Sequence, residues 1–144
     1  MQGGVILILI LNIVLLLIRL SWTDIKSRVI SNNIILALLF LVIPFGYLLN
    51  GELYITLALI SLSIGFLLFL FNVIGAGDIK LITVLMLTIP SEQILSFFVF
   101  TSFFGLLLII IGWLFFKTSI KRNGLPYGVA ISLGYLTNLA LFNL

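Results

Sequence analysis

The amino-acid sequence predicts an all-α membrane protein, on three observations. Hydrophobic residues make up 63% of the 144 residues and charged residues only 8%, whereas a soluble domain has about 25% charged residues. Long apolar stretches recur along the whole chain, separated by short polar segments. Spans of about 20 residues cross a hydrocarbon core, so six of them would use about 120 residues. We therefore expect one domain, residues 1–144, with six transmembrane helices.

The limits of the apolar stretches define the six predicted spans. The first stretch has no charge before Arg19 and lacks the basic start and cleavage site of a signal peptide, so we expect a retained helix. The second ends at Asn50-Gly51, a pair typical of tight turns. The fourth would be only about 21 Å long, so its polar start should lie below the headgroups. The predicted spans are residues 5–20, 34–49, 53–71, 76–89, 91–116 and 125–142.

The basic residues predict how the spans are oriented. All seven Lys and Arg residues lie in or beside the first, third and fifth loops, whereas Glu52 and Glu92 lie in the others. The positive-inside rule makes the odd loops cytoplasmic and places both termini outside. Because the basic residues form no single dense patch, we expect no nucleic-acid partner. Those of the fifth loop, Lys117, Lys121 and Arg122, should contact anionic membrane lipid.

The absence of cysteine and histidine restricts the possible chemistry. No disulfide, thiolate nucleophile, imidazole base or ordinary zinc site can be built from this chain. We expect neither a metal nor a cofactor. Carboxylates, amines, hydroxyls and the backbone remain.

Two of the four acidic residues, Asp24 and Asp78, lie at cytoplasmic ends of predicted spans. Ionisable groups at membrane depth are costly and indicate function. Asp24 could instead pair with Lys26 or Arg28, and Asp78 could cap a helix. Two aspartates on one face could also form a dyad, with one carboxylate ionised to activate water and the other protonated to donate to a carbonyl.

Two glycines precede the second aspartate, in Gly75-Ala-Gly-Asp-Ile-Lys-Leu81. Small residues at Gly75 and Gly77 allow a second backbone to approach closely, which suits substrate binding. The segment resembles the GxGDxKL signature of the type IV prepilin peptidases, which are GxGD intramembrane aspartyl proteases. Lys80, inside the signature, is a candidate substrate contact, although snorkelling to the headgroups explains it equally well.

Two other segments are similar to motifs of the same family. Residues 24–32 match its Asp-x5-Ile-Pro-Asn motif except that Ser31 replaces the proline. Residues 125–134 resemble its closing helix, and the resemblance places Pro126, Tyr127 and Gly128 near the active site. The loop after Asp24 is short and has no Cys, which resembles the peptidase-only branch serving tight-adherence (Flp) pili.

The resemblance implies a membrane-embedded aspartic endopeptidase with Asp24 and Asp78 as its catalytic pair. Its substrate would be a type IV pilin-like precursor, cut between a short basic leader and a hydrophobic helix at the cytoplasmic face of the inner membrane. The alternative is a non-enzymatic assembly or transporter subunit in which both aspartates form ion pairs. We also expect Asn12, Asn72 and Asn138 to hydrogen-bond between helices rather than to contact substrate.

Overall fold

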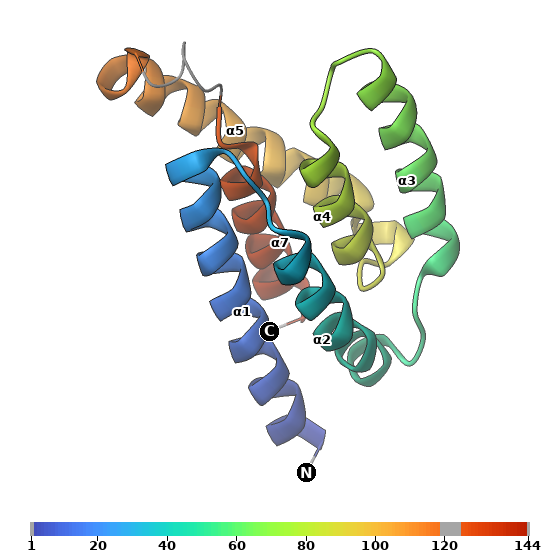
Figure 1. Cartoon of the computed structure of the whole chain (residues 1–144). Helices are drawn as coiled ribbons and strands as arrows, with labels where there is room; N and C mark the ends of the chain where they lie inside the picture. Colours follow the sequence, from blue (N-terminus) through green and yellow to red (C-terminus); the bar gives the residue numbers. More distant parts are fainter. Residues whose placement is uncertain (1, 119–124, 144) are drawn as a thin grey trace.

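The computed structural model describes residues 2–118 and 125–143, and the regular structure within these ranges is entirely helical (Figure 1). This confirms the predicted all-α class. Lys121 and Arg122, expected to contact lipid, lie outside the described residues. The elements, in chain order, are α1 (Gln2–Ser27), α2 (Asn32–Asn50), α3 (Ile55–Leu70), α4 (Ala76–Met86), the 3₁₀ turn η1 (Ser91–Gln93), α5 (Ile94–Phe115) and α7 (Tyr127–Asn143).

A helix occupies most of each predicted span. Three helical stretches are long and apolar enough to cross a membrane, namely Gly3–Ser27, Asn32–Asn50 and Ser91–Phe115, and α3 is a shorter apolar helix. In Figure 1 the start of α1 and the end of α7 lie toward one end of the bundle, while the end of α1 and the starts of α4 and α7 lie toward the other. The prediction for residues 76–89 was too long, because α4 ends at Met86.

The end of α1 lies further along the chain than expected, since the first predicted span ended at residue 20. The helix continues to Ser27, so Asp24 belongs to its last turns. The polar side chains there do not interrupt the helix, because Thr23 donates to the Leu20 carbonyl and Ser27 to the Thr23 carbonyl. The chain leaves the helix at Arg28, whose φ is 55°.

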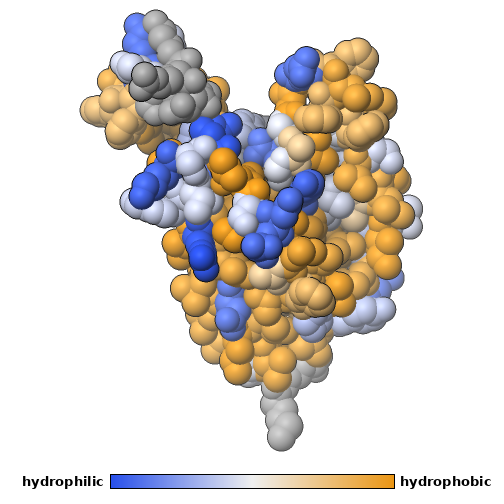
Figure 2. All heavy atoms as spheres, in the orientation of Figure 1, coloured by the Kyte–Doolittle hydropathy of each residue, from blue (hydrophilic) through white to orange (hydrophobic). Residues whose placement is uncertain are grey.

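The core lies where α1, α2, α4 and α7 meet, and α5 packs against α7. Most of the largest fully buried side chains come from these five helices, among them Leu17, Leu20, Leu38, Phe45, Leu81, Leu85, Phe97, Ile131 and Tyr135. On the face drawn in Figure 2 the sides of the bundle are mostly apolar, and hydrophilic residues gather toward the end where α1 ends and α4 begins. Such a surface is that of a membrane protein.

Two sets of polar contacts fix the other end of the bundle. The Thr88 hydroxyl, just after α4, lies 2.8 Å from the Tyr135 hydroxyl of α7, and Asn50 donates to the Thr88 carbonyl. Asn138 of α7 accepts from Ser96 and donates to the Gln93 side chain. The expected interhelical bonding of Asn138 is therefore confirmed. These contacts hold α7 against the end of α4 and against η1 and the start of α5.

The other two asparagines do not behave as expected. The Asn12 side chain donates to the Ile8 carbonyl of its own helix, because it points away from the bundle. Asn72 is exposed in the turn after α3 with a φ of 59°, a conformation that asparagine tolerates better than most residues. Bonding to another helix of the same chain was therefore the wrong prediction for Asn12, and the structure gives no such bond for Asn72.

Candidate active site

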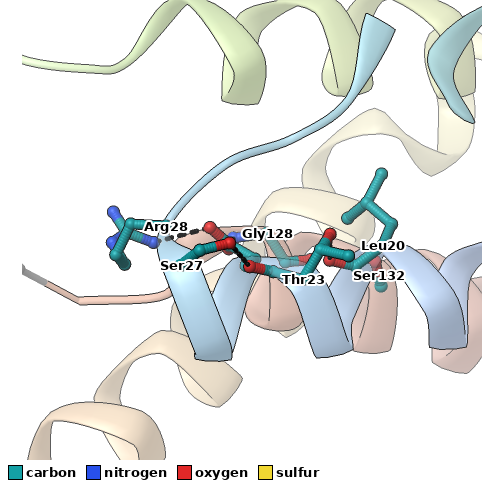
Figure 3. A network of polar contacts seen from close by, with 7 residues as sticks. Leu20, Thr23, Ser27, Arg28, Gly128 and Ser132 are labelled. Carbon is teal, nitrogen blue, oxygen red and sulfur yellow. Dashed lines mark hydrogen bonds and ion pairs between the residues drawn. The ribbon is translucent and has the colours of Figure 1, made fainter. Parts of the chain in front are cut away.

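Asp24 is held by two donors from different parts of the chain. Its side chain is only 2% exposed. The Arg28 guanidinium donates to Oδ1 at 2.8 Å, and the backbone N–H of Gly128, 104 positions away at the start of α7, donates to Oδ2 at 2.8 Å. Figure 3 shows this network, with Arg28 at the end of α1 and Gly128 and Ser132 on α7. Bonds to both oxygens stabilise the ionised carboxylate.

Asp78 lies in the first turn of α4, beside the Asp24 site. The helix begins after Gly75, whose backbone is extended and which has no side chain to act as a cap. Asp78 is buried. Unpaired N–H groups and the helix dipole favour an acidic residue in this turn. Ile30 lies beside both Gly77, which precedes Asp78, and Gly128, whose N–H binds Asp24, so the two aspartates lie in the same region of the fold.

Ile30 fills the space between the motifs. A Cβ built on Gly77 would lie 3.1 Å from the Ile30 Cβ, and one built on Gly128 would lie 3.2 Å from the Ile30 Cδ1. Both glycines therefore provide room for Ile30. Gly75 differs, since it is exposed and a Cβ there would meet only the Asp78 Oδ2, at 3.6 Å. Of the two glycines predicted to bind substrate, Gly75 has the open surface and Gly77 packs internally.

The remaining predicted substrate contacts lie near the starts of α4 and α7. Lys80 is exposed, and its Nζ donates to the Asn32 Oδ1 at 3.0 Å, which joins the start of α4 to the start of α2. Pro126 is half-buried immediately before α7. The Tyr127 hydroxyl lies against Gly105 of α5, where an added Cβ would be 2.9 Å away. The side chain of Tyr127 thus anchors α7 on α5.

The serine that replaces the motif proline preserves the shape of the loop. Ser31 has φ −66° and ψ 133°, and proline fixes φ near −65°. Its hydroxyl also accepts from the Asn33 N–H and caps α2, which is the usual function of serine at this position. The backbone after Asp24 therefore follows a path that a proline could take.

The sequence did not predict two parts of the site. Gly128 was expected near the active site, but nothing in the sequence indicates that its N–H binds Asp24. The position of Ile30 between two glycines was also not anticipated. The pairing of Asp24 with Arg28 was foreseen as one of two alternatives, whereas Lys26 is exposed on the helix surface. Within the described residues, no three His, Cys, Asp or Glu side chains converge as a metal site.

Fold and site together define a class: an all-helical membrane protein with two buried aspartates, from separate helices, toward the polar end of the bundle. The family model for the type IV leader peptidase family matches residues 9–110, which is more than half of the chain, and the protein belongs to that family. The matched region contains Asp24, Asp78 and the glycines before Asp78. Comparison with curated proteins and with solved structures gives no significant match. Membership of this family and the long apolar helices make the chain a peptidase of the membrane.

Proposed function

We propose that the protein is an aspartic endopeptidase that uses Asp24 and Asp78 to remove the leader of a pilin-like precursor. The observation that carries the proposal is that both aspartates are buried and lie in one region, although they come from separate helices. Ile30 packs against Gly77, next to Asp78, and against Gly128, whose N–H binds Asp24. An ion-pair function would account for Asp24, which is bonded to Arg28. Asp78 has no ion-pair partner within the described residues, so for this residue the alternative would rest only on the helix dipole at the first turn of α4.

The different surroundings of the two acids suggest how they divide the reaction. Asp24, with donors on both oxygens, is the ionised member and takes a proton from the attacking water. Asp78, beside that negative charge, carries the shared proton and gives it to the carbonyl oxygen of the scissile bond. When the C–N bond breaks, the proton on Asp24 passes to the leaving amine and the proton on the oxygen returns to Asp78. The cycle therefore starts and ends in the same state.

Gly75 supports a small residue before the scissile bond. It is exposed beside Asp78, so an extended substrate backbone can lie against it without meeting a side chain. A bulky substrate residue there would hold its carbonyl away from the pair, and a displacement of about 1 Å can cost on the order of a hundredfold in rate. We expect glycine at this substrate position, followed by a hydrophobic helix.

We place the reaction at the cytoplasmic face of the inner membrane, in a chain with six spans and both termini outside. The alternating directions of the helices and the basic residues near the end of α1 and the start of α4 support this orientation. The short loop between α1 and α2, without cysteine, favours peptidase activity alone and a substrate of the Flp type.

Co-expression with an Flp-type prepilin tests the proposal. Removal of the leader, seen as a smaller pilin band with a new N-terminus, is the expected result. A prepilin whose glycine before the cut is changed to valine should remain unprocessed, whereas alanine should be partly tolerated. Full-length pilin in every case would favour the alternative, a membrane assembly or transporter subunit with structural ion pairs.

A further inference from the structure

Asn12 is a polar residue on the outward surface of a membrane-spanning helix. It lies about 15 Å from the start of α1 and about 22 Å from its end, at 1.5 Å per residue, and is therefore well inside the hydrocarbon. Its side chain is exposed and donates one bond to the Ile8 carbonyl. Among the residues that the structure describes, the other amide N–H and the amide oxygen have no partner. Lipid chains cannot supply one.

The residues around Asn12 form an apolar stripe along the same surface. Val5, Ile8 and Leu15 are 47%, 60% and 64% exposed. With Asn12 they follow a spacing of three, four and three residues, which is the pattern of the contact positions in two parallel helices. We name these four residues the α1 stripe. The opposite side of α1, with Ile13 and Leu17, is buried against the bundle, and α1 itself lies at the bundle's edge (Figure 1).

We propose that the α1 stripe is the contact surface for a second copy of this chain, with the two Asn12 amides hydrogen-bonded to each other. Copies of a membrane protein insert with one orientation, so a two-fold axis between them runs along the membrane normal. Each residue then lies at the same depth as the same residue of the other copy. Asn12 then meets Asn12. An amide is both donor and acceptor, so each side chain satisfies the other. A different protein would need a polar group at this depth by coincidence.

The contact is confined to the N-terminal half of α1. Arg19 continues the same spacing and is exposed, so two close copies would bring like charges together at that level. The long arginine side chain can extend to the headgroups, and the two helices can separate there. The dyad at the end of α1 therefore stays outside the contact.

The absence of native cysteine makes disulfide cross-linking a clean test. Single-cysteine variants Ile8→Cys and Leu15→Cys of the full chain, oxidised in native membranes, should form covalent dimers. Leu106→Cys on α5, which is 53% exposed, is the matched control and should not. Equal yields at Ile8 and Leu106, or a cross-link from Ile8 to a different protein, would overturn the proposal.

The amide is tested in the Ile8→Cys background. Asn12→Leu should weaken dimerisation by roughly three- to thirtyfold, the range for interhelical polar bonds in membranes, and Asn12→Gln should retain most of it. Thermal unfolding of the monomer fraction should be unchanged, because the Asn12 side chain faces outward. An unchanged dimer yield in Asn12→Leu would contradict the assigned function of the amide, whatever the yields of the cysteine variants.

Discussion

The substitution Gly128→Ala tests the link between α7 and Asp24 with a single methyl group. The Gly128 backbone N–H donates to the Asp24 Oδ2 at 2.8 Å. A Cβ at this position would lie 2.6 Å from the same oxygen and 3.2 Å from the Ile30 Cδ1. The new carbon and the hydrogen bond therefore cannot share the present geometry. The carboxylate ends a rotatable side chain, whereas Gly128 belongs to the backbone of α7, so the carboxylate is the group expected to move.

The size of the effect follows from these distances. Oδ2 must retreat by about 0.8 Å to reach ordinary van der Waals contact with the new carbon. The charged hydrogen bond is then lost, a cost of about 1.5–3 kcal/mol. That cost and a displacement approaching 1 Å both predict a fall in cleavage rate of roughly 10- to 150-fold. The fall should appear in kcat rather than KM, since the substrate surface at Gly75 is unchanged.

Purified enzyme and a synthetic prepilin, with leader release followed over time, provide the assay. Two glycine variants serve as controls. Gly4→Ala, with nothing within 4 Å of the added carbon, should match the parent. Gly134→Ala, whose Cβ would collide with Thr101 of α5, should lower thermal stability but keep kcat per folded molecule. A Gly128→Ala enzyme that is folded and cleaves at the parent rate would refute the role given to this N–H.

Three further predictions concern the surroundings of the pair. Arg28→Ala should lower kcat by more than tenfold, and Arg28→Lys should restore part of the activity, because a cation near the carboxylate matters more than the guanidinium shape. Equal activity of both variants and the parent would show that the ion pair is dispensable. Gly77→Ala should reduce the amount of folded protein by crowding Ile30, and the added change Ile30→Ala should restore it in a thermal unfolding assay. Cysteine at Ser91 should react with an impermeant thiol reagent in intact cells and cysteine at Ser27 only in opened cells, with labelling of Ser27 from outside contradicting the orientation.

The helices could be predicted because apolar composition and membrane thickness restrict this chain severely. Their ends could not, since polar residues near an interface can bond to their own helix, as Thr23 and Ser27 do. The same local bonding explains Asn12, whose side chain was expected to reach another helix. A single sequence gives the residue type and its depth but not the direction in which the side chain points.

The sequence could indicate which two acidic residues belong to the candidate site, but not how they are held. The motif order indicated Asp24 and Asp78, and the positive-inside pattern indicated that they share a face. The Gly128 N–H could not be foreseen, because any backbone amide can donate and only the packing of α7 on α1 selects this one. The different surroundings of Gly75 and Gly77 depend likewise on where Ile30 lies.

The cleavage activity of aspartate-to-asparagine variants tests most directly whether Asp24 and Asp78 form the catalytic pair. Asp24→Asn and Asp78→Asn keep the volume of each side chain but remove the acid, so both proteins should insert at the parent level. We predict that each abolishes leader removal and that the double variant is no worse than either single one, because the two groups act as a unit. Glu52→Gln, an exposed acid outside the site, should cleave normally. Near-normal leader removal by either single aspartate variant would contradict the assignment of the pair.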